Sequence, residues 1–345
     1  MLRFTLVSVC LGFCGIGLVT ADEPAPIEQA KIRAAIEKSI PQLLAGAVGH
    51  RENRTCFACH SMGLPVLALT AAKAKGFAID EEELKKQLAH TAKFLAGNKE
   101  NFLKGQGTGG QADSAGYALW TLAAGDCSPD ETTAAVAEYL LLRHKDRDHW
   151  GSSGKRPPTE DTAFSTTYMA LYGLERFGTE AQAERIAKRR DDTRAWLLKT
   201  PARETEERVF RLWGLEAAGA TAAEIESAAK ELLARQRVDG GWAQLDSGEP
   251  ATALESDAYA TATSLVALHE AGGLKTTDAA YQRGLAYLLK TQQPDGTWHV
   301  VTRSKPIQPY FETGFPYGKD QFISTAGSAW ATWALVLACD TNPKH

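Results

Sequence analysis

The sequence has little excess charge of either sign and few residues that break regular structure. Its 345 residues include 38 basic and 42 acidic side chains, which gives a net charge of -4. Nucleic-acid binding needs a concentrated basic surface, so this balance argues against a nucleic-acid partner. The 14 prolines and 30 glycines are too few for a disordered or collagen-like chain. The composition is therefore that of an ordinary globular protein, of about two domains by length alone.

Residues 1–21 are predicted to be a secretory signal peptide. A short basic start, Met1–Arg3, precedes an almost unbroken apolar run over residues 4–19, and small residues lead to Ala21. A bilayer span takes about 20 apolar residues, so this run favours cleavage after Ala21 over an uncleaved membrane anchor. No later stretch is apolar enough to span a membrane. We therefore expect an exported protein, periplasmic or extracellular, with no membrane span after cleavage.

The rest of the chain contains an internal repeat. Segments 229–242 and 285–298 match at an offset of 56 residues, with Leu-Leu, Gln, Asp-Gly and Trp in the same positions. A weaker copy runs from Ala137 to Trp150, and a truncated copy covers Trp196–Thr200. A repeat of this length indicates an architecture built from stacked copies of one unit.

The repeat predicts pairs of helices. Alanine-rich segments follow the motif copies at 161–178, 257–272 and 320–338, and segments 113–125 and 206–219 match the same pattern. Each starts with a polar residue suited to helix capping, and most of them end at glycine. With helical segments at 32–44 and 65–74, six pairs begin near residues 28, 80, 130, 182, 222 and 276. We predict an all-α fold in which residues 22–345 form a single (α/α)6 toroid of six helix pairs.

The Gln-x-x-Asp-Gly-x-Trp segments Gln236–Trp242 and Gln292–Trp298 resemble the repeats of squalene and hopene cyclases and of protein prenyltransferases. The resemblance covers nearly the whole chain after residue 21 and is weaker in the first half. It implies an α/α toroid in which Trp242 and Trp298 pack at the ends of outer helices. It also implies that Gln236 and Gln292 connect successive repeats through hydrogen bonds.

The activities of those families are not expected here. The cyclases protonate their substrate with an Asp-x-Asp-Asp cluster, whereas this chain has only the adjacent pair Asp191-Asp192. The prenyltransferases hold zinc with an Asp-x-Cys pair and a distant histidine, and neither Cys127 nor Cys339 lies in that pattern. A shared fold does not carry its function with it.

Residues 56–60 form a Cys-x-x-Cys-His motif, the attachment signature of c-type haem. Two thiols three residues apart can add to the vinyl groups of one porphyrin, and the next residue places an imidazole beneath the iron. Attachment of this kind follows export, which agrees with the predicted signal peptide. We expect one covalent haem c, held by Cys56 and Cys59 with His60 as the proximal ligand. A disulfide and a zinc site are the alternatives.

The motif precedes the first inner helix, so we expect it at the rim of the ring where the inner helices start. His299 and His149 each neighbour a repeat tryptophan on that rim, and each is a candidate second iron ligand. The long loop 298–321 is expected to be functional, with a packed connector as the alternative. Candidates for catalysis or proton transfer are His299, His149, Tyr310, Asp257 and Asp161, although the aspartates also suit helix capping.

Our leading hypothesis is an exported monohaem c-type protein that transfers electrons to or from a redox partner. One alternative is a haem enzyme with an open iron site, peroxidase-like or oxygen-handling. A second alternative is a toroidal binding module that takes an apolar or glycan small-molecule ligand in the central cavity. A six-coordinate iron favours electron transfer and a five-coordinate iron favours catalysis, so the sequence leaves both open.

Overall fold

The computed structural model describes residues 26–245, 254–306 and 309–341. The predicted signal peptide, residues 1–21, lies outside this part of the chain. The described residues contain 13 α-helices and no strand, with two isolated β-bridges in the connections. None of the described helices is long and apolar enough to cross a membrane.

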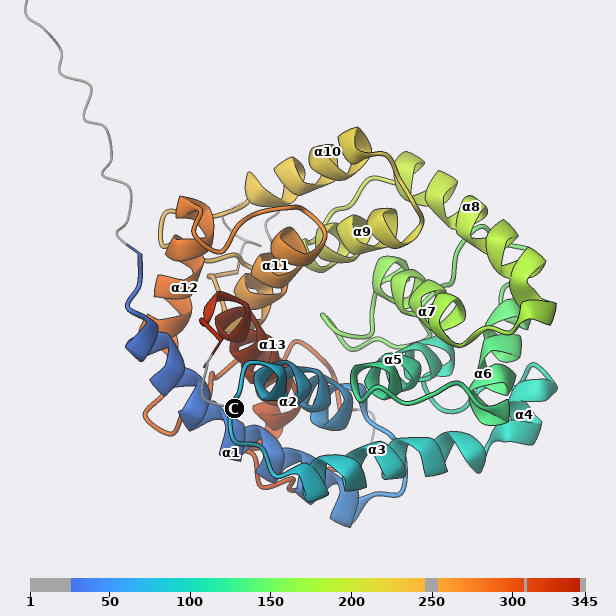
Figure 1. The fold of residues 1–345 in the computed structure, drawn as a ribbon, viewed down its shortest axis with the longest axis horizontal. Coiled ribbons are helices and arrows are strands. Elements are labelled where there is room, and N and C mark those ends of the chain that lie inside the picture. Colours follow the sequence, from blue (N-terminus) through green and yellow to red (C-terminus); the bar gives the residue numbers. More distant parts are fainter. Residues whose placement is uncertain (1–25, 246–253, 307–308, 342–345) are drawn as a thin grey trace, which may run out of the picture.

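The helices form two concentric rings (Figure 1). The outer ring contains α1 (Gln29–Asn53), α3 (Glu81–Ala96), α6 (Glu131–Leu142), α8 (Ala183–Lys199), α10 (Ala222–Leu233) and α12 (Ala279–Thr291). The inner ring contains α2 (Leu64–Ala74), α5 (Gln111–Ala124), α7 (Ala163–Phe177), α9 (Thr205–Ala217), α11 (Ala258–Glu270) and α13 (Gln321–Ala338). A short helix, α4 (Lys99–Leu103), packs on α6. The predicted all-α toroid of six helix pairs is confirmed.

The inner ring closes on itself. Each inner helix packs against the next along the chain, and the last one, α13, packs against the first, α2. The outer ring closes at the same place, where Gln292 Nε2 donates to the carbonyl oxygen of Ala35 on α1 at 2.9 Å. Gln29 Nε2 joins the two rings there by donating to Ala338 O at 3.0 Å. We call this junction of α1 and α2 with α12 and α13 the seam.

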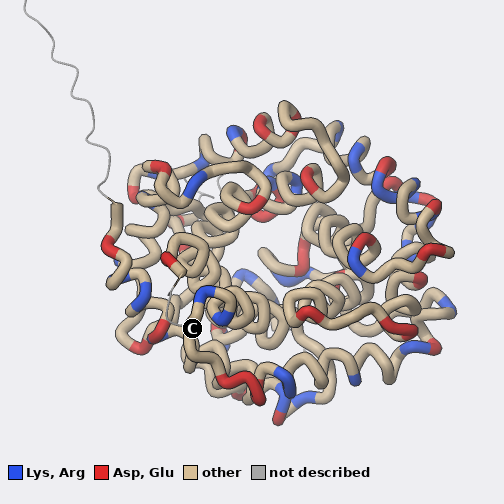
Figure 2. The backbone as a smooth tube through the Cα atoms, in the orientation of Figure 1, with Lys and Arg blue, Asp and Glu red and all other residues tan. Residues whose placement is uncertain are grey.

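Polarity separates the two rings. The inner helices are buried almost all round, whereas Figure 2 shows charged residues mainly along the outer helices, with both signs interspersed. Small residues let the inner helices approach closely: a Cβ atom added to Gly116 of α5 would lie 2.7 Å from Met169 Cβ of α7. Met169 is fully buried in this contact and belongs to the core. The high alanine and glycine content of these helices therefore reflects tight packing.

The repeat tryptophans make the same contacts in three places. Each indole Nε1 donates to a leucine carbonyl ten residues earlier, at the end of an outer helix, and each backbone N–H donates to a hydroxyl on the following inner helix. The carbonyl acceptors for Trp150, Trp242 and Trp298 are Leu140, Leu232 and Leu288, at 2.8, 3.0 and 2.8 Å. The hydroxyl acceptors are those of Thr167, Thr261 and Ser328, at 3.0, 2.9 and 2.9 Å. The predicted packing at outer-helix ends is confirmed.

The repeat glutamines connect neighbouring outer helices. Gln236 Nε2 donates to Gly240 O in its own loop at 2.9 Å and to Ala280 O on α12 at 2.7 Å. Gln292 Nε2 makes the matching pair of bonds, to Gly296 O at 3.0 Å and to Ala35 O at 2.9 Å. The loop needs glycine because Gly296 has φ +91° and its added Cβ would lie 2.4 Å from Lys38 O. The predicted hydrogen bonds between repeats are confirmed.

Aromatic side chains fill the middle of the inner ring. The Trp120 ring on α5 lies 5.7–6.0 Å, centroid to centroid, from five others on three inner helices. These are Tyr168 and Tyr172 on α7, Trp213 on α9, and Trp330 and Trp333 on α13. We call these six residues the aromatic floor, because they lie below the polar groups at the inner-helix starts.

Candidate functional site

The Cys-x-x-Cys-His motif lies at the junction between α1 and the first inner helix. Cys56 follows the end of α1 and is exposed, whereas Cys59 and His60 begin a π-helical turn, Cys59–Gly63, that continues into α2. π-Helical turns inside α-helices are rare and are often found at functional sites. Cys56 and Cys59 are both free thiols in the structure. The local fold therefore presents one thiol outwards and buries the other, with the neighbouring imidazole partly buried.

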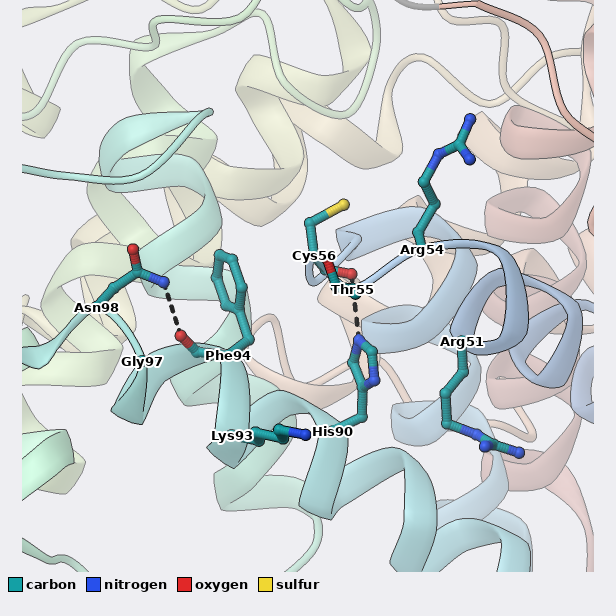
Figure 3. Close-up of a pocket in the computed structure, with 9 residues that line it drawn as sticks. All are labelled: Arg51, Arg54, Thr55, Cys56, His90, Lys93, Phe94, Gly97 and Asn98. Carbon is teal, nitrogen blue, oxygen red and sulfur yellow. Dashed lines mark hydrogen bonds between the residues drawn. The ribbon is translucent and has the colours of Figure 1, made fainter.

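Cys56 lines a surface pocket of about 430 Å³ between the motif and α3 (Figure 3). The other lining residues are Arg51, Arg54, Thr55, His90, Lys93, Phe94, Gly97 and Asn98. The pocket is cationic, although Glu83 pairs with Arg51 at 2.9 Å. The Arg54 guanidinium lies 3.8 Å above the ring of Phe311. The pocket thus combines a thiol, positive charge and the aromatic ring of Phe94.

Two histidines fix the backbone of the motif. His50 Nε2 and His90 Nε2 lie 3.2 and 3.3 Å from the same acceptor, the carbonyl oxygen of Cys56. Burial lowers the pKa of His50 to about 4, so its imidazole is neutral at pH 7. Because His50 comes from α1 and His90 from α3, the motif is held between two outer helices. The sequence indicates no role for either residue. Their role is visible only in the structure, where both contact the carbonyl oxygen of Cys56.

The buried part of the motif contacts a carboxylate that lies 101 residues away in the sequence. The Cys59 thiol donates to Glu160, and Cys59 Sγ is 3.3 Å from His60 Nδ1. The ligand atoms of Cys59, His60 and Glu160 all lie within 4.8 Å of one another. Glu160 is buried and pairs with Arg156 at 3.2 Å. The connection before α7 therefore supplies a third potential ligand that the sequence analysis did not identify.

Burial sets the protonation of this cluster. It lowers the pKa of His60 to about 3, with a smaller contribution from the positive charge of Arg156. The imidazole is therefore neutral at pH 7, which is the form that binds a metal ion. Burial also raises the pKa of the Cys59 thiol well above its ordinary value, and the neighbouring Glu160 raises it further. In this structure Cys59 is thus a protonated hydrogen-bond donor.

The predicted second ligands have partners elsewhere. His299 Nε2 lies 2.9 Å from Asp320 Oδ2, and its ring stacks on Tyr317 with centroids 4.5 Å apart. His149 Nδ1 lies 2.7 Å from Asp148 Oδ1, and its ring stacks on Trp196 with centroids 4.4 Å apart. Both remain predictions as iron ligands.

The other candidates also lie in separate places. Asp257 caps α11 by accepting from Ala260 N at 3.0 Å, and burial raises its pKa to about 6. Asp161 is exposed in the connection before α7. Tyr310 is exposed and donates to Glu312. The long loop reaches the residues beside the motif through Phe311, whose ring lies 5.6 Å from that of His50 on α1.

A second group of polar residues faces the inside of the ring. Tyr259 Oη on α11 donates to Glu206 Oε1 on α9 at 3.0 Å, and both residues are buried. Burial raises the pKa of Tyr117 on α5 well above its ordinary value, and nearby Cys59, Glu206, Glu160 and Asp113 raise it further. We call Tyr117, Glu206 and Tyr259 the interior cluster. Glu206 was expected only to open a helix, so its inward direction is a finding of the structure.

Comparisons with known proteins agree with this architecture. Residues 206–323 match the family model described as squalene-hopene cyclase C-terminal domain. A variant of the type II terpene cyclase MstE from Scytonema, in complex with merosterolic acid A, is similar over 91% of this chain and 99% of that chain, with 17% identity and a TM-score of 0.56. Unsaturated glucuronyl hydrolase from Bacillus sp. GL1 is similar over 87% and 96%, with 13% identity and a TM-score of 0.53. Comparison with curated protein sequences finds no match.

The chain is therefore a cyclase-like α/α toroid, and the repeat resemblance is shown by both kinds of comparison. At these identities the structural likeness concerns the fold. The two named proteins have different activities on one architecture, so the activity of this chain has to be argued from its own residues.

Proposed function

We propose that the protein is an exported monohaem c-type redox protein, with haem attached to Cys56 and Cys59 and His60 as the axial ligand. The observation that carries this proposal is the motif itself in its structural setting. Two free thiols lie three residues apart, the first at the edge of a cationic pocket and the second next to a neutral imidazole. An electron-transfer role needs a redox partner, and the exposed side of Cys56 is where that partner would approach.

The residues around the motif fit a haem. A haem is a flat apolar macrocycle with two carboxylates, and the pocket beside Cys56 offers the Phe94 ring together with the cations of Arg54 and Lys93. Arg–carboxylate pairs are among the stronger hydrogen-bonded contacts in proteins. His60 makes its hydrogen bond through Nδ1, which leaves Nε2 for iron. When bound, the haem would supply an iron that changes its charge by one electron.

Attachment would also change the role of Glu160. Each thiol adds its sulfur to one carbon of a vinyl group and its proton to the other, so atoms and electrons balance without an oxidant. Cys59 then has no proton to donate to Glu160. His60 Nδ1 is the neighbouring donor within the same cluster. A carboxylate that accepts from a ligating histidine fixes the ring and increases its basicity, so Glu160 would position His60 and stabilise oxidised iron.

The test is covalent haem content. Expression with a haem c maturation system should give protein that stays red after denaturation, with a bis-thioether pyridine haemochrome spectrum. Replacing both Cys56 and Cys59 by Ala should abolish covalent attachment, because no thiol of the motif then remains. Cys127→Ala is the matched control, because Cys127 is a free thiol far from the motif in sequence and on the connection after α5. Colourless protein, or haem that acid-acetone extracts, would contradict the proposal.

A mononuclear metal site is the second candidate, favoured by the convergence of Cys59, His60 and Glu160. Catalytic zinc sites use three protein ligands and keep one position open for water. The two proposals separate by mutation. Glu160→Gln should remove a bound metal and leave covalent haem intact. Cys56→Ala should leave the metal bound, because Cys56 is not in the three-residue cluster, and should reduce the haem attachment to a single thioether bond. Elemental analysis beside the haemochrome spectrum reads both outcomes.

Small-molecule binding inside the ring is a further part of the proposal. A variant of the neighbour MstE is known in complex with geranylgeranyl dihydroxybenzoate, its substrate. In this chain the aromatic floor occupies the middle of the ring, which favours a small ligand over a long polyprenyl chain.

Spectra with and without carbon monoxide decide between electron transfer and open-site haem catalysis. A low-spin iron that ignores carbon monoxide supports electron transfer, whereas carbon monoxide binding supports an open-site haem enzyme.

A further inference from the structure

Two buried polar atoms of the interior cluster have no hydrogen-bond partner among the described residues. They are the hydroxyl oxygen of Tyr117 and Oε2 of Glu206. Tyr117 is 0% exposed and Glu206 is 3% exposed, so bulk water does not reach them. A buried polar atom without a partner lowers the stability of the folded state, because it gives up its hydrogen bonds to water on folding. Such groups are rare in folded proteins, and each one needs an explanation.

The positions of these residues on their helices bring the side chains to the same level of the ring. Glu206 and Tyr259 lie in the first turns of α9 and α11. Tyr117 lies further along α5, but helical side chains lean towards the helix N-terminus, which brings its hydroxyl back to the same level. The charge of Glu206 affects Tyr117 although α5 and α9 are not neighbours in the ring. The two side chains therefore lie close enough inside the ring to interact electrostatically.

This region has an apolar side and a polar side. The Tyr117 ring is 6.2 Å from that of Trp120, so the aromatic floor begins directly next to the cluster. Tyr259 already uses its hydroxyl on Glu206 Oε1. What the cluster leaves unused is the Tyr117 hydroxyl and the second oxygen of Glu206.

We propose that the interior cluster, Tyr117, Glu206 and Tyr259, is the binding site of a small neutral molecule with a carbonyl or hydroxyl oxygen and an apolar body. The apolar body would lie on the aromatic floor, and the oxygen would accept from Tyr117 and Glu206. This site deepens the small-molecule part of the proposed function and does not depend on haem.

Electrostatics select a neutral ligand. Burial raises the pKa of Glu206 well above its ordinary value, so the carboxyl group is a neutral acid that can donate from Oε2. Asp113 and Glu160 are also close enough to raise the pKa of Tyr117. An anion would meet these acidic groups, and Arg303, the nearby cation, already faces Glu204 at 3.7 Å. A cation would meet a neutral carboxyl group and phenol oxygens, which bind it less strongly than an ionised carboxylate would.

The first test measures the cost of the unpaired hydroxyl. Tyr117→Phe should raise the melting temperature by about 1–3 °C, because it removes a buried group that has no partner. Tyr281→Phe is the matched control: its hydroxyl is equally buried but donates to Ala334 O at 2.8 Å, so this variant should melt lower than the wild type. If Tyr117→Phe melts lower to the same extent, the hydroxyl has a permanent partner and the site is excluded.

The second test measures binding with three compounds of similar shape: cyclohexanone, cyclohexylammonium and cyclohexanecarboxylate. Ligand-detected NMR on the full protein should show saturable binding of cyclohexanone. Tyr117→Phe and Glu206→Leu should each weaken it about fivefold or more, the effect of one hydrogen bond. Absence of cyclohexanone binding, equal affinity in the variants, or stronger binding of either charged compound would overturn the proposal. These variants keep Cys56, Cys59 and His60, so their haem content reports separately on the proposed function.

Discussion

The connections 236–242 and 292–298 join outer to inner helices with the same set of side-chain hydrogen bonds. The connection at 54–63 joins the first outer helix to the first inner helix without that set. In the two repeat loops the glutamine, aspartate and tryptophan side chains all have partners within the fold. The first connection leaves the Cys56 thiol exposed and the buried Oγ of Ser61 without a partner in the described part of the chain. The buried Nδ1 of His50, at the end of the preceding helix α1, also has no partner there. The motif side chains of the repeat loops are therefore all hydrogen-bonded within the fold, whereas not all side chains of the first connection are.

This difference distinguishes residues that stabilise the ring, such as the repeat tryptophans and glutamines, from residues available to bind a ligand or cofactor. Buried polar groups without partners lower stability, so each of them is a candidate for a role beyond holding the fold. The interior cluster belongs with the first connection in this respect. We therefore expect substitutions in the repeat loops to reduce stability, and substitutions in the first connection or the interior cluster to reduce binding.

The largest expected effect is at a repeat tryptophan. Trp242→Ala removes a fully buried indole and its hydrogen bond to Leu232 O, and should reduce the free energy of unfolding by about 3–5 kcal/mol. Trp298→Ala should behave in the same way, because its contacts are the same. Urea denaturation measures both. A loss below about 1 kcal/mol in either variant would contradict the shared structural role.

The next effect is a pH dependence from the interior. Burial raises the pKa of Asp113 from 3.8 to about 6, and the residue is 1% exposed. The folded state therefore holds a proton that the unfolded state releases, so stability should fall as the pH rises from about 4 to 6. A shift of this size corresponds to about 3 kcal/mol. Asp113→Asn should flatten that part of the stability curve, measured by urea unfolding at several pH values; an unchanged slope would count against the assignment.

A smaller effect is expected at the glutamines. Gln292→Ala removes the side-chain bonds to Ala35 and Gly296 and should cost about 1–2 kcal/mol. Gln293→Ala is a suitable control because the neighbouring side chain is exposed and bonds only to Thr291 O. Equal melting temperatures for the two variants would show that the bond across the seam contributes nothing.

The smallest effect on stability is expected in the motif. Cys56→Ala should change the free energy of unfolding by no more than about 0.5 kcal/mol, because Cys56 is exposed. The same variant should lose one of the two thioether bonds to haem. Loss of stability comparable to that of Trp242→Ala would mean that the motif is structural and would remove the distinction between the two kinds of connection.

Most of the fold could be predicted from the sequence because its information is local and repeated. Helix starts follow from capping residues, and the outer helices begin within three residues of the expected positions. Ring closure follows from having six pairs. The contacts of Trp242 and Gln236 could be predicted because the same motif recurs at the same place in successive helix pairs and makes equivalent contacts there.

The site could be predicted only in part. Cys56, Cys59 and His60 are adjacent in sequence, so their chemistry is visible without a structure. Glu160 and His90 reach the motif from other helix pairs, and their approach depends on how the connections fold after the ring has closed. No local pattern distinguishes Glu206, which faces the interior, from an ordinary first-turn glutamate that faces solvent.

The seam has a mechanical consequence. Each of the other junctions between consecutive helix pairs is crossed by the backbone, but α12 and α13 meet α1 and α2 only through non-covalent contacts such as Gln292 to Ala35 and Gln29 to Ala338. A stretching force applied across this junction is therefore resisted by packing and hydrogen bonds alone. The ring can therefore open at the seam without breaking the chain, and the seam lies directly beside the Cys-x-x-Cys-His motif.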